Sequence, residues 1–269
     1  MCSSDLMDSS KKTDYGNWIP RKLMNALWGI FLGVLLLLIV NALFWRNAGA
    51  ALLLGALSGL SLVAAVYMQY CRKTIDLRGG GLAGKFYDDL LDHLAWQGQG
   101  RLLDIGCGSG ALSIRCARRF PGAQVIGVDY WSGVWDYSQK QCEENARLEG
   151  CDGRIDFRHG DAARLEFADE SFDAVVSCFV FHEVKTISGR SKRPVVEEAL
   201  RVLKKGGSFA FVDLFGRSAL YGDMEELVQQ MKDSGLREVG YVSRAGASFV
   251  PALARPVMTA GVGLLYGVK

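Results

Sequence analysis

A glycine-rich run in the middle of the chain has the residue types and spacing of a nucleotide-like binding site. Residues 104–110 read DIGCGSG, between an expected strand at 101–105 and an expected helix at 111–120. Glycines there permit a tight turn and close approach of a ligand to the backbone, and the helix start leaves N–H groups free. Asp129 ends the next expected strand, where an acid suits hydrogen bonding to ribose hydroxyls. These residues predict a ligand at the carboxyl ends of the strands.

The glycine loop alone is compatible with two ligand classes. Gly106, Gly108 and Ala111 also fit the G-x-G-x-x-[GA] dinucleotide fingerprint. A nicotinamide-dependent reductase on a Rossmann-like sheet, with hydride transfer as its chemistry, is therefore one alternative.

Two titratable residues follow later strands and are candidates for catalysis. His182 comes just after an expected strand at 172–178, and an unperturbed histidine titrates near neutral pH. It is a candidate base or acceptor-orienting group; the alternative is that it caps or packs the next helix. Asp213 ends the expected strand 208–213 and either lines an acceptor pocket or is a structural acid. A base is needed only if the acceptor must lose a proton.

Strands and helices alternate through the second part of the chain, which predicts an α/β fold with a parallel sheet covered on both faces. Pro194 lies in the first turn of one expected helix, which ends at 204–207, and Asp223 with Glu226 resembles a capping box for another, which ends at Gly235. The other expected helices are 86–96, 111–120 and 131–149, and the expected strands are 101–105, 124–129, 154–158, 172–178, 208–213, 237–243 and 261–268.

Two long uncharged segments precede this region. Leu23–Trp45 and Asn47–Cys71 each exceed the roughly 20 apolar residues that cross a bilayer core. Ala48–Ala50 resembles a signal-peptide cleavage site, but a signal h-region is only about 7–15 residues long. We therefore expect a transmembrane α-hairpin with a tight turn at Arg46. Its Gly29–Gly33 and Gly55–Gly59 spacings indicate a closely packed hairpin or a helix-mediated homodimer, unless they reflect only the frequency of glycine in such helices.

Flanking charges orient this hairpin. Only Arg46 lies between the spans, whereas basic residues flank both outer ends: Lys11, Lys12, Arg21, Lys22, Arg72, Lys73 and Arg78. The positive-inside rule then places both termini and the catalytic domain in the cytoplasm. We expect an N-terminal cytoplasmic segment at 1–22, transmembrane helices at about 23–45 and 47–71, a linker at 72–84, and a catalytic domain at 85–269.

The charge gives no indication of a nucleic-acid partner, and the cysteine pattern argues against a metal site. The net charge is +2, from 31 basic and 29 acidic residues, so nothing indicates a nucleic-acid partner, which would need a clustered basic face. The seven cysteines form no C-x-x-C pair and no Cys/His cluster at zinc spacing. We expect no metal site, and thiols in a reducing compartment.

Several ordered motifs decide between the ligand classes by resemblance. LLDIGCGSG at 102–110, VIGVDYW at 125–131 and HGDAARLEF at 159–167 resemble the first three motifs of class I S-adenosylmethionine-dependent methyltransferases. SFDAVVS at 171–177 and ALRVLKKGGSFAFVD at 199–213 resemble the fourth and fifth strands of the ubiquinone/menaquinone biosynthesis group. The resemblance covers about 85–243. It implies a seven-stranded Rossmann-like sheet and S-adenosyl-L-methionine as cofactor.

The same resemblance implies a role for each residue that matches a motif. The glycine loop would hold the amino-acid end of the cofactor through Asp104, Gly106, Cys107, Gly108 and Gly110. Asp129 would bind the ribose, Tyr130 or Trp131 would pack on the adenine, Asp161 and Ala162 would meet the adenine edge, and Cys178 would lie under the sulfonium. The alternatives are a solvent-facing acid at Asp129, a turn former at Asp161 and a core residue at Trp131.

Taken together, the sequence predicts a membrane-anchored methyltransferase that transfers a methyl group in line to a small or lipid-soluble acceptor. Besides the reductase, the remaining alternative is a non-catalytic S-adenosylmethionine-binding membrane scaffold. The segment 245–260 is long and apolar for a hairpin loop between strands. We expect it to cover the acceptor pocket or to touch lipid.

Overall fold

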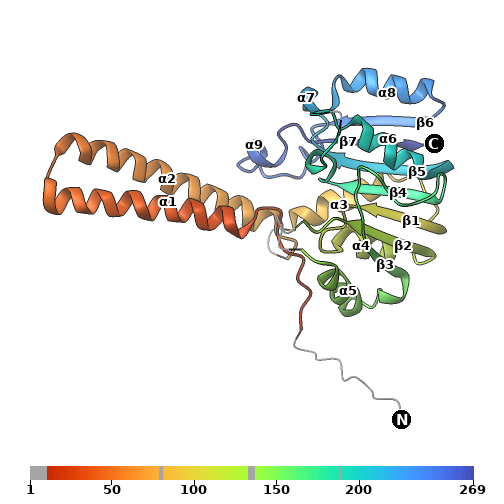
Figure 1. Cartoon of the computed structure of the whole chain (residues 1–269), viewed down its shortest axis with the longest axis horizontal. Coiled ribbons are helices and arrows are strands. Elements are labelled where there is room, and N and C mark those ends of the chain that lie inside the picture. Colours follow the sequence, from red (N-terminus) through yellow and green to blue (C-terminus); the bar gives the residue numbers. More distant parts are fainter. Residues whose placement is uncertain (1–10, 79–80, 133–136, 188) are drawn as a thin grey trace, which may run out of the picture. The chain divides into compact units, whose positions relative to one another are not determined.

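The computed structural model describes residues 11–78, 81–132, 137–187 and 189–269 and divides the chain into two compact units (Figure 1). The first contains the described part of Met1–Gly16 together with Gly84–Phe249 and Thr259–Lys269. The second contains Asn17–Ala83 and Val250–Met258. The expected N-terminal segment is thus described only from residue 11 onward.

A seven-stranded mixed sheet forms the centre of the first unit, in the order β3-β2-β1-β4-β5-β7-β6. The strands β1 to β5 pair in parallel, whereas β7 runs antiparallel to both β5 and β6. This order confirms the predicted Rossmann-like methyltransferase sheet. The expected parallel pairing holds for β1 to β5 only, so the sheet is mixed. The strands are β1 Gly100–Ile105, β2 Ala123–Asp129, β3 Ile155–His159, β4 Phe172–Cys178, β5 Leu203–Asp213, β6 Arg237–Ser243 and β7 Gly263–Val268.

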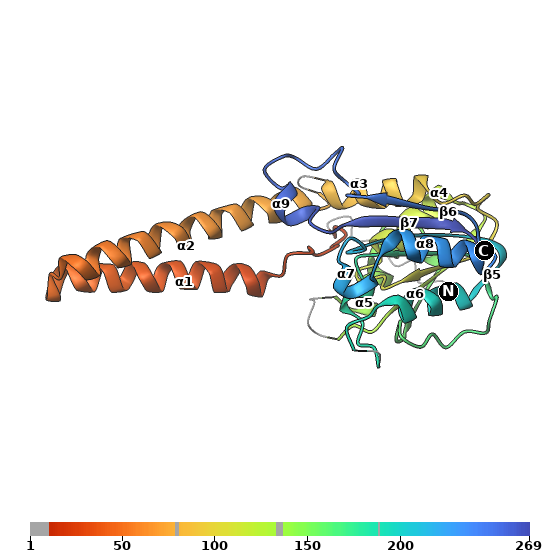
Figure 2. The same ribbon diagram turned by 90° about the horizontal axis from the view of Figure 1, so that it is seen from above.

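Helices cover both faces of this sheet. Figure 2 shows α4 on one face and α6 with α8 on the other. The described helices of this part of the chain are α3 Leu82–Asp92, α4 Ala111–Arg119, α5 Gln139–Leu148, α6 Arg193–Arg201, α7 Ser218–Tyr221 and α8 Met224–Asp233, with short 3-10 turns at Asp152–Arg154 and Phe181–Glu183.

Aromatic packing fills the core between β5 and the α6/α8 face. Phe209 and Phe211 are fully buried, with ring centroids 5.2 Å apart, and Phe181 meets Phe211 edge-on at 5.1 Å. Burying one such side chain stabilises the fold by about 1.5–3 kcal/mol relative to exposing it. The core therefore fixes the end of β5, where Asp213 lies.

Three predicted helices had wrong boundaries. The helix expected at 86–96 is α3, Leu82–Asp92, which begins and ends four residues earlier. The helix expected at 131–149 begins only at Gln139, where the Ser138 hydroxyl accepts a hydrogen bond from the Gln141 N–H; residues 133–136 lie outside the described part of the chain. The helix expected to end at 204–207 ends at Arg201, and β5 begins at Leu203. Leu203 pairs with Phe172 of β4, and the Lys204 ammonium pairs with Asp173 of the same strand at 2.7 Å. Pro194 and the Asp223 cap lie as predicted.

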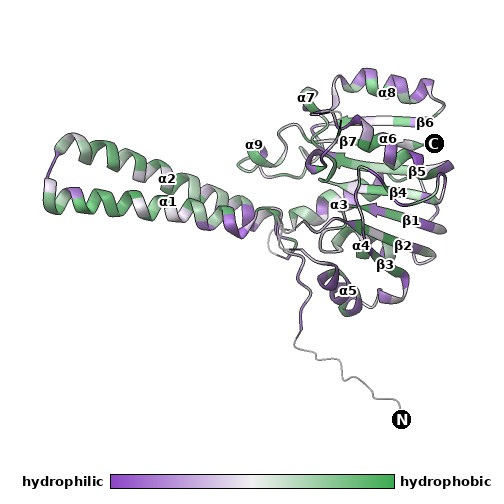
Figure 3. Ribbon diagram, viewed as in Figure 1, coloured by the Kyte–Doolittle hydropathy of each residue, from purple (hydrophilic) through white to green (hydrophobic). Residues whose placement is uncertain are grey.

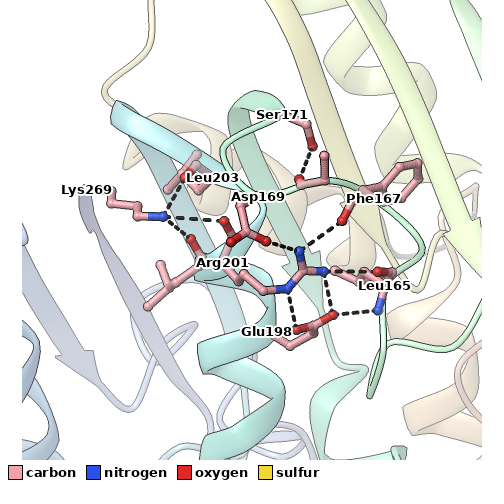
Figure 4. Close-up of polar contacts among 10 residues, drawn as sticks. Leu165, Phe167, Asp169, Ser171, Glu198, Arg201, Leu203 and Lys269 are labelled. Atoms are coloured by element: carbon pink, nitrogen blue, oxygen red, sulfur yellow. Dashed lines mark hydrogen bonds and ion pairs between the residues drawn. The ribbon is translucent and has the colours of Figure 1, made fainter.

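The loop that follows β3 is fastened to α6 by Arg201 (Figure 4). Its guanidinium donates to the carbonyl oxygens of Leu165 and Phe167 and pairs with Glu198 and Asp169 at 2.8 and 2.6 Å. Glu198 also accepts a hydrogen bond from the Leu165 N–H. Such a planar, multiply bonded guanidinium holds one geometry. It therefore fixes the loop that carries Asp161.

The second unit is built on a helical hairpin. The helix α1, Arg21–Val40, continues as a π-helical turn at Asn41–Trp45, and α2 spans Ala48–Ile75. Asn47 caps α2 by accepting from the Ala50 N–H at 2.9 Å, while the Asn41 side chain donates to the Asn47 carbonyl at 3.0 Å. Figure 3 shows apolar residues along both helices. Each is long and apolar enough to cross a membrane.

The glycine pairs of the hairpin do not make its helix–helix contact. A Cβ added at Gly29, Gly33, Gly55 or Gly59 would meet no neighbouring atom within 4 Å in the described chain. The interpretation of these spacings as a closely packed hairpin was therefore wrong.

Candidate active site

The glycine loop between β1 and α4 is held against β2 by backbone hydrogen bonds. The N–H groups of Gly106 and Cys107 both donate to the Val128 carbonyl, at 2.7 and 3.1 Å. Gly106 has a φ of +75°, and a Cβ there would lie 2.1 Å from Val180 Cγ2. Gly110, with a φ of +82°, begins α4, and no side chain of the described residues caps that helix. The loop thus needs glycine at these positions.

Asp104 lies beneath this loop. It is 1% exposed, and it accepts a hydrogen bond from the Ser113 hydroxyl at 2.6 Å. Burial raises the pKa of this carboxyl to about 7, because its effect outweighs that of the hydrogen bond from Ser113, which lowers the pKa. Asp104 therefore ties the loop to α4 from inside the protein.

Asp129 joins the glycine loop to the backbone that follows β2. Its Oδ2 accepts from the Gly108 N–H at 2.9 Å and its Oδ1 from the Trp131 N–H at 2.7 Å. The Trp131 indole N–H in turn donates to the Gly108 carbonyl at 2.9 Å. Trp131 has a φ of +42°, an uncommon backbone conformation for a residue other than glycine. These three residues form a closed ring of hydrogen bonds, and each carboxylate oxygen retains a further lone pair.

Two expected adenine contacts lie close to this ring. The exposed Tyr130 ring packs at 5.1 Å from the His159 ring, and the Gly160 N–H donates to the Asp129 carbonyl. Asp161, the residue after Gly160, therefore lies near the end of β2. Its Oδ1 already accepts a hydrogen bond from the Ala163 N–H at 2.8 Å. That bond is typical of an Asx turn. Ala162 packs against the core.

Cys178 ends β4 and is followed by an aromatic cluster that the sequence reasoning missed. Burial raises the pKa of its thiol well above the usual range, so the thiol is neutral. Phe179 has a φ of +57°, and its ring meets Phe86 at 5.3 Å. Phe249 packs on the other side of Phe86 at 5.1 Å. An apolar surface therefore adjoins the end of β4.

His182 and Asp213 form an ion pair at the carboxyl ends of β4 and β5. His182 Nδ1 lies 2.9 Å from Asp213 Oδ1, and its Nε2 lies 3.3 Å from Glu183 Oε1. The Asp213 side chain is 1% exposed, whereas that of His182 is 20% exposed. Burial lowers the pKa of His182, but the hydrogen bonds and charges of Asp213 and Glu183 outweigh it and raise the pKa to about 9. The imidazole is therefore protonated at neutral pH.

This geometry can be compared with known proteins. Residues 103–211 match the methyltransferase domain family. They form a methyltransferase domain.

The chain is also similar to curated proteins. A ubiquinone/menaquinone biosynthesis C-methyltransferase of Dinoroseobacter shibae is 33% identical over 132 residues, 49% of this chain and 49% of that protein. A demethylmenaquinone methyltransferase of Clavibacter sepedonicus is 37% identical over 107 residues, 40% of this chain and 38% of that protein. The chain thus spans about half the length, or less, of the curated relatives it matches.

Among solved structures, a geranyl diphosphate C-methyltransferase from Streptomyces coelicolor is similar with a TM-score of 0.52. The two are 20% identical, and the similarity covers 71% of this chain and 80% of that one. At this identity the similarity shows the fold. It confirms the expected methyltransferase sheet.

A short N-terminal strap, residues 14–16, also belongs to the first unit. The buried Asn145 of α5 accepts from the Asp14 N–H at 2.8 Å and donates to the Asp14 carbonyl at 2.7 Å. It also donates to the Ser109 carbonyl at 2.9 Å, while the Ser109 hydroxyl donates to the Tyr15 carbonyl. Asn145 therefore links the strap to the glycine loop. The sequence carried no signal for this contact, because it joins backbone atoms more than 90 residues apart along the chain.

The structure brings most of the predicted residues to one edge of the sheet. The glycine loop, Asp129, Cys178, His182 and Asp213 all lie at the carboxyl ends of β1, β2, β4 and β5. Parallel strands present these ends at a common edge, where ligands bind in open α/β sheets. The site can therefore hold a nucleotide-like cofactor beside a buried ion pair.

Proposed function

We propose that this chain is a membrane-anchored, S-adenosylmethionine-dependent methyltransferase acting on a small, lipid-soluble acceptor. The observation that carries the proposal is the common position of the glycine loop and the His182–Asp213 pair at one edge of the sheet. It supplies a cofactor site and an acceptor-facing charged group together. The family match of residues 103–211 supports the reaction type.

The residues around the glycine loop fit this cofactor. The uncapped first turn of α4 suits the carboxylate of the amino-acid end, because helix N-terminal N–H groups attract anions. Asp129 keeps lone pairs for the ribose hydroxyls beyond its bonds to Gly108 and Trp131. Around these, Tyr130 or Trp131 would pack on the adenine, and Asp161 with Ala162 would meet its edge. The neutral thiol of Cys178 suits a place near the sulfonium.

Methyl transfer from a sulfonium needs little covalent help from the protein. Bound S-adenosylmethionine would supply an activated methyl group: the electron pair of its S–CH₃ bond would stay on sulfur, so S-adenosylhomocysteine would leave as a neutral thioether while the acceptor gained the methyl group. Positioning of the two reactants can then supply most of the rate. Phe179 and Phe249, which are partly exposed and pack on the buried Phe86, offer an apolar surface on which an apolar acceptor can be oriented.

The His182–Asp213 pair determines which acceptors react best. Protonated at neutral pH, His182 is a donor rather than a base. Its Nε2, which lies 3.3 Å from Oε1 of the half-exposed Glu183 side chain, can donate to an oxygen anion of the acceptor. That contact favours ionisation of an acidic hydroxyl, such as a phenol, before transfer. Asp213 holds the ring through Nδ1 and stabilises its charge.

The hairpin supports a membrane anchor. Within the described chain, only 6% and 11% of the most apolar 18-residue stretches of the two spans are buried, unlike the core helix of a soluble protein. The basic residues at their outer ends support two passes with both termini and the methyltransferase domain in the cytoplasm. An anchor raises the concentration of the enzyme near acceptors dissolved in the bilayer. The open glycine faces of the hairpin are compatible with a helix-mediated homodimer.

Labelled cofactor tests the proposal. The full chain in lipid nanodiscs is incubated with methyl-labelled S-adenosylmethionine and a total lipid extract of bacterial membranes. We expect label in an organic-solvent-extractable product, and none with Asp129→Ala. Tight cofactor binding without transfer would indicate the scaffold alternative, and binding of a nicotinamide cofactor in its place would indicate the reductase.

A further inference from the structure

The connection between β6 and β7 begins and ends beside the ion pair of the proposed active site. Ser243, the last residue of β6, pairs with Gly263, the first residue of β7. Gly263 also pairs with Asp213 on the neighbouring strand β5. The chain therefore leaves the sheet and returns to it at the register of Asp213.

The middle of this connection belongs to the helical-hairpin unit. Val250–Met258 groups with Asn17–Ala83 and contains the short helix α9, Arg255–Met258. Within that unit, the Tyr67 hydroxyl of α2 donates a hydrogen bond to the Leu253 carbonyl at 2.9 Å. Within the segment, Arg255 Nε donates a hydrogen bond to the Val250 carbonyl at 3.0 Å. A specific polar contact thus attaches the segment to α2.

The segment exposes apolar side chains. Leu253 is 63% exposed and Val257 is 44% exposed, in the nine-residue sequence VPALARPVM. Arg255 is the only charged residue there. Long cationic side chains of this kind direct their charge toward water while their stems cover apolar surface. This composition suits the boundary between lipid headgroups and acyl chains.

The contact with Tyr67 determines the depth of the segment relative to the proposed spans. Tyr67 precedes Arg72 by five residues, a rise of about 7.5 Å along a helix. Arg72 and Lys73 in the last turns of α2 mark the cytoplasmic membrane surface in the proposed topology. Amphipathic elements that lie in a membrane interface bury their apolar face by about 5–10 Å. The Leu253 carbonyl, which is bonded to Tyr67, lies about 7.5 Å from the level of Arg72 along α2, which is within this range.

We propose that Val250–Met258 is immersed in the cytoplasmic interface of the bilayer, at the boundary between lipid headgroups and acyl chains. The occupant of this surface is lipid, not a second protein. The inference rests on the proposed membrane anchor and deepens it, because it gives the helical-hairpin unit a membrane contact besides its two proposed spans.

Photocrosslinking in nanodiscs tests the membrane contact directly. Benzoylphenylalanine is placed at Leu253 in the full chain, in nanodiscs of phosphatidylcholine and phosphatidylglycerol, and adducts are identified by mass spectrometry. Leu60, an exposed apolar residue of α2, is the positive control, and Ile187, an exposed apolar residue of the methyltransferase unit, is the matched negative control. We expect lipid adducts at positions 253 and 60, with position 187 at background.

The possible outcomes separate this inference from the anchor itself. Lipid adducts at position 60 without adducts at 253 would overturn the inference and leave the anchor standing. No lipid adduct at either position would overturn both. A protein adduct at 253 in place of lipid would show a second copy or a partner there and would also overturn it.

A second variant tests the link to Tyr67 without adding charge. Tyr67→Phe removes the hydroxyl that donates to Leu253 and keeps the ring, so the fold is retained. We expect several-fold fewer lipid adducts at position 253 and unchanged adducts at position 60. The paired change Leu253→Asp with Val257→Asp should lower transfer to membrane-extract acceptors about tenfold while the Kd for S-adenosylhomocysteine is unchanged. An equal loss of cofactor affinity, or unchanged adducts in Tyr67→Phe, would contradict the inference.

Discussion

The imidazole of His182 and the carboxylate of Asp213 lie 2.9 Å apart at the ends of two adjacent strands, and the carboxylate is almost completely buried. The Asp213 carboxylate also accepts a hydrogen bond from the Leu214 N–H at 2.6 Å. A buried, multiply bonded carboxylate favours the protonated ring, which is why the pKa of His182 rises to about 9 despite its burial. The pair can therefore be tested through its titration.

Stability should depend on pH through this pair. The pKa of His182 is raised from 6.5 to about 9, so its stabilisation is fully present below pH 6.5 and is lost as the pH rises through 9. The full loss corresponds to about 3 kcal/mol at most. Chemical unfolding of the wild type at pH 6 and pH 10 should show this decrease. His182→Gln should remove most of it, and an equal decrease in that variant would contradict the assignment.

Activity should follow the same titration if His182 acts as a donor. At saturating cofactor, kcat/KM should fall as the pH rises through about 9, because the imidazolium loses its proton. Asp213→Asn should shift the fall toward lower pH and reduce activity about tenfold or more. A profile that instead rises through pH 9 would show that His182 is a base.

Removal of the Asp129 carboxylate should weaken cofactor binding. Asp129→Ala leaves the Gly108 and Trp131 N–H groups without their acceptor, and hydrogen bonds to a charged group contribute about 1.5–3 kcal/mol each. We expect the Kd for S-adenosylhomocysteine, measured by calorimetry, to rise at least tenfold. Asp233→Ala, which removes an exposed acid from α8, is the control and should bind as the wild type does.

The glycine at position 106 should be required for packing as well as for backbone conformation. Gly106→Ala places a Cβ 2.1 Å from Val180, whereas Gly150→Ala meets no atom within 4 Å at a similar positive φ. The Gly150 variant should lose only about 1–2 kcal/mol of unfolding free energy, and the Gly106 variant more. Adding Val180→Ala should restore part of the loss in Gly106→Ala. Equal losses at positions 106 and 150 would show that the contact with Val180 does not matter.

The strap should be coupled to the cofactor site through Asn145. Asn145→Leu leaves the Asp14 and Ser109 backbone groups without their side-chain partner, at a cost of about 1–3 kcal/mol for each buried group left unpaired. We expect faster trypsin cleavage after Lys11 or Lys12 and a higher Kd for S-adenosylhomocysteine. Bound S-adenosylhomocysteine should slow this cleavage in the wild type. Cleavage that is indifferent to the ligand would contradict the coupling.

The sequence predicted the elements whose signals are local. Short apolar runs located the five parallel strands, and the Asp223 cap and Pro194 located two helix starts. The helix predicted at 131–149 begins only at Gln139, whereas Trp131 adopts a positive φ and is hydrogen-bonded to Asp129 and Gly108. The hydrogen bonds of Trp131 to Asp129 and Gly108 cannot be predicted from local helix propensity.

The sequence pattern did not predict side-chain contacts between residues that are far apart along the chain. His182 and Asp213 were each chosen from their place after a strand, but their direct pairing depends on β4 and β5 being neighbours. Asn145 was not singled out, since its role arises from bonds to Asp14 and Ser109. Side-chain partners of this kind are set by tertiary packing.

The central claim is that this chain transfers a methyl group from S-adenosylmethionine to an apolar acceptor in a membrane. Its most direct test is the transfer of label from methyl-labelled S-adenosylmethionine by the full chain in nanodiscs supplied with membrane lipid extract. The account predicts labelled, solvent-extractable product that is absent with Asp129→Ala and that decreases as the pH rises through 9. Stoichiometric cofactor binding with no labelled product from any membrane extract would contradict it.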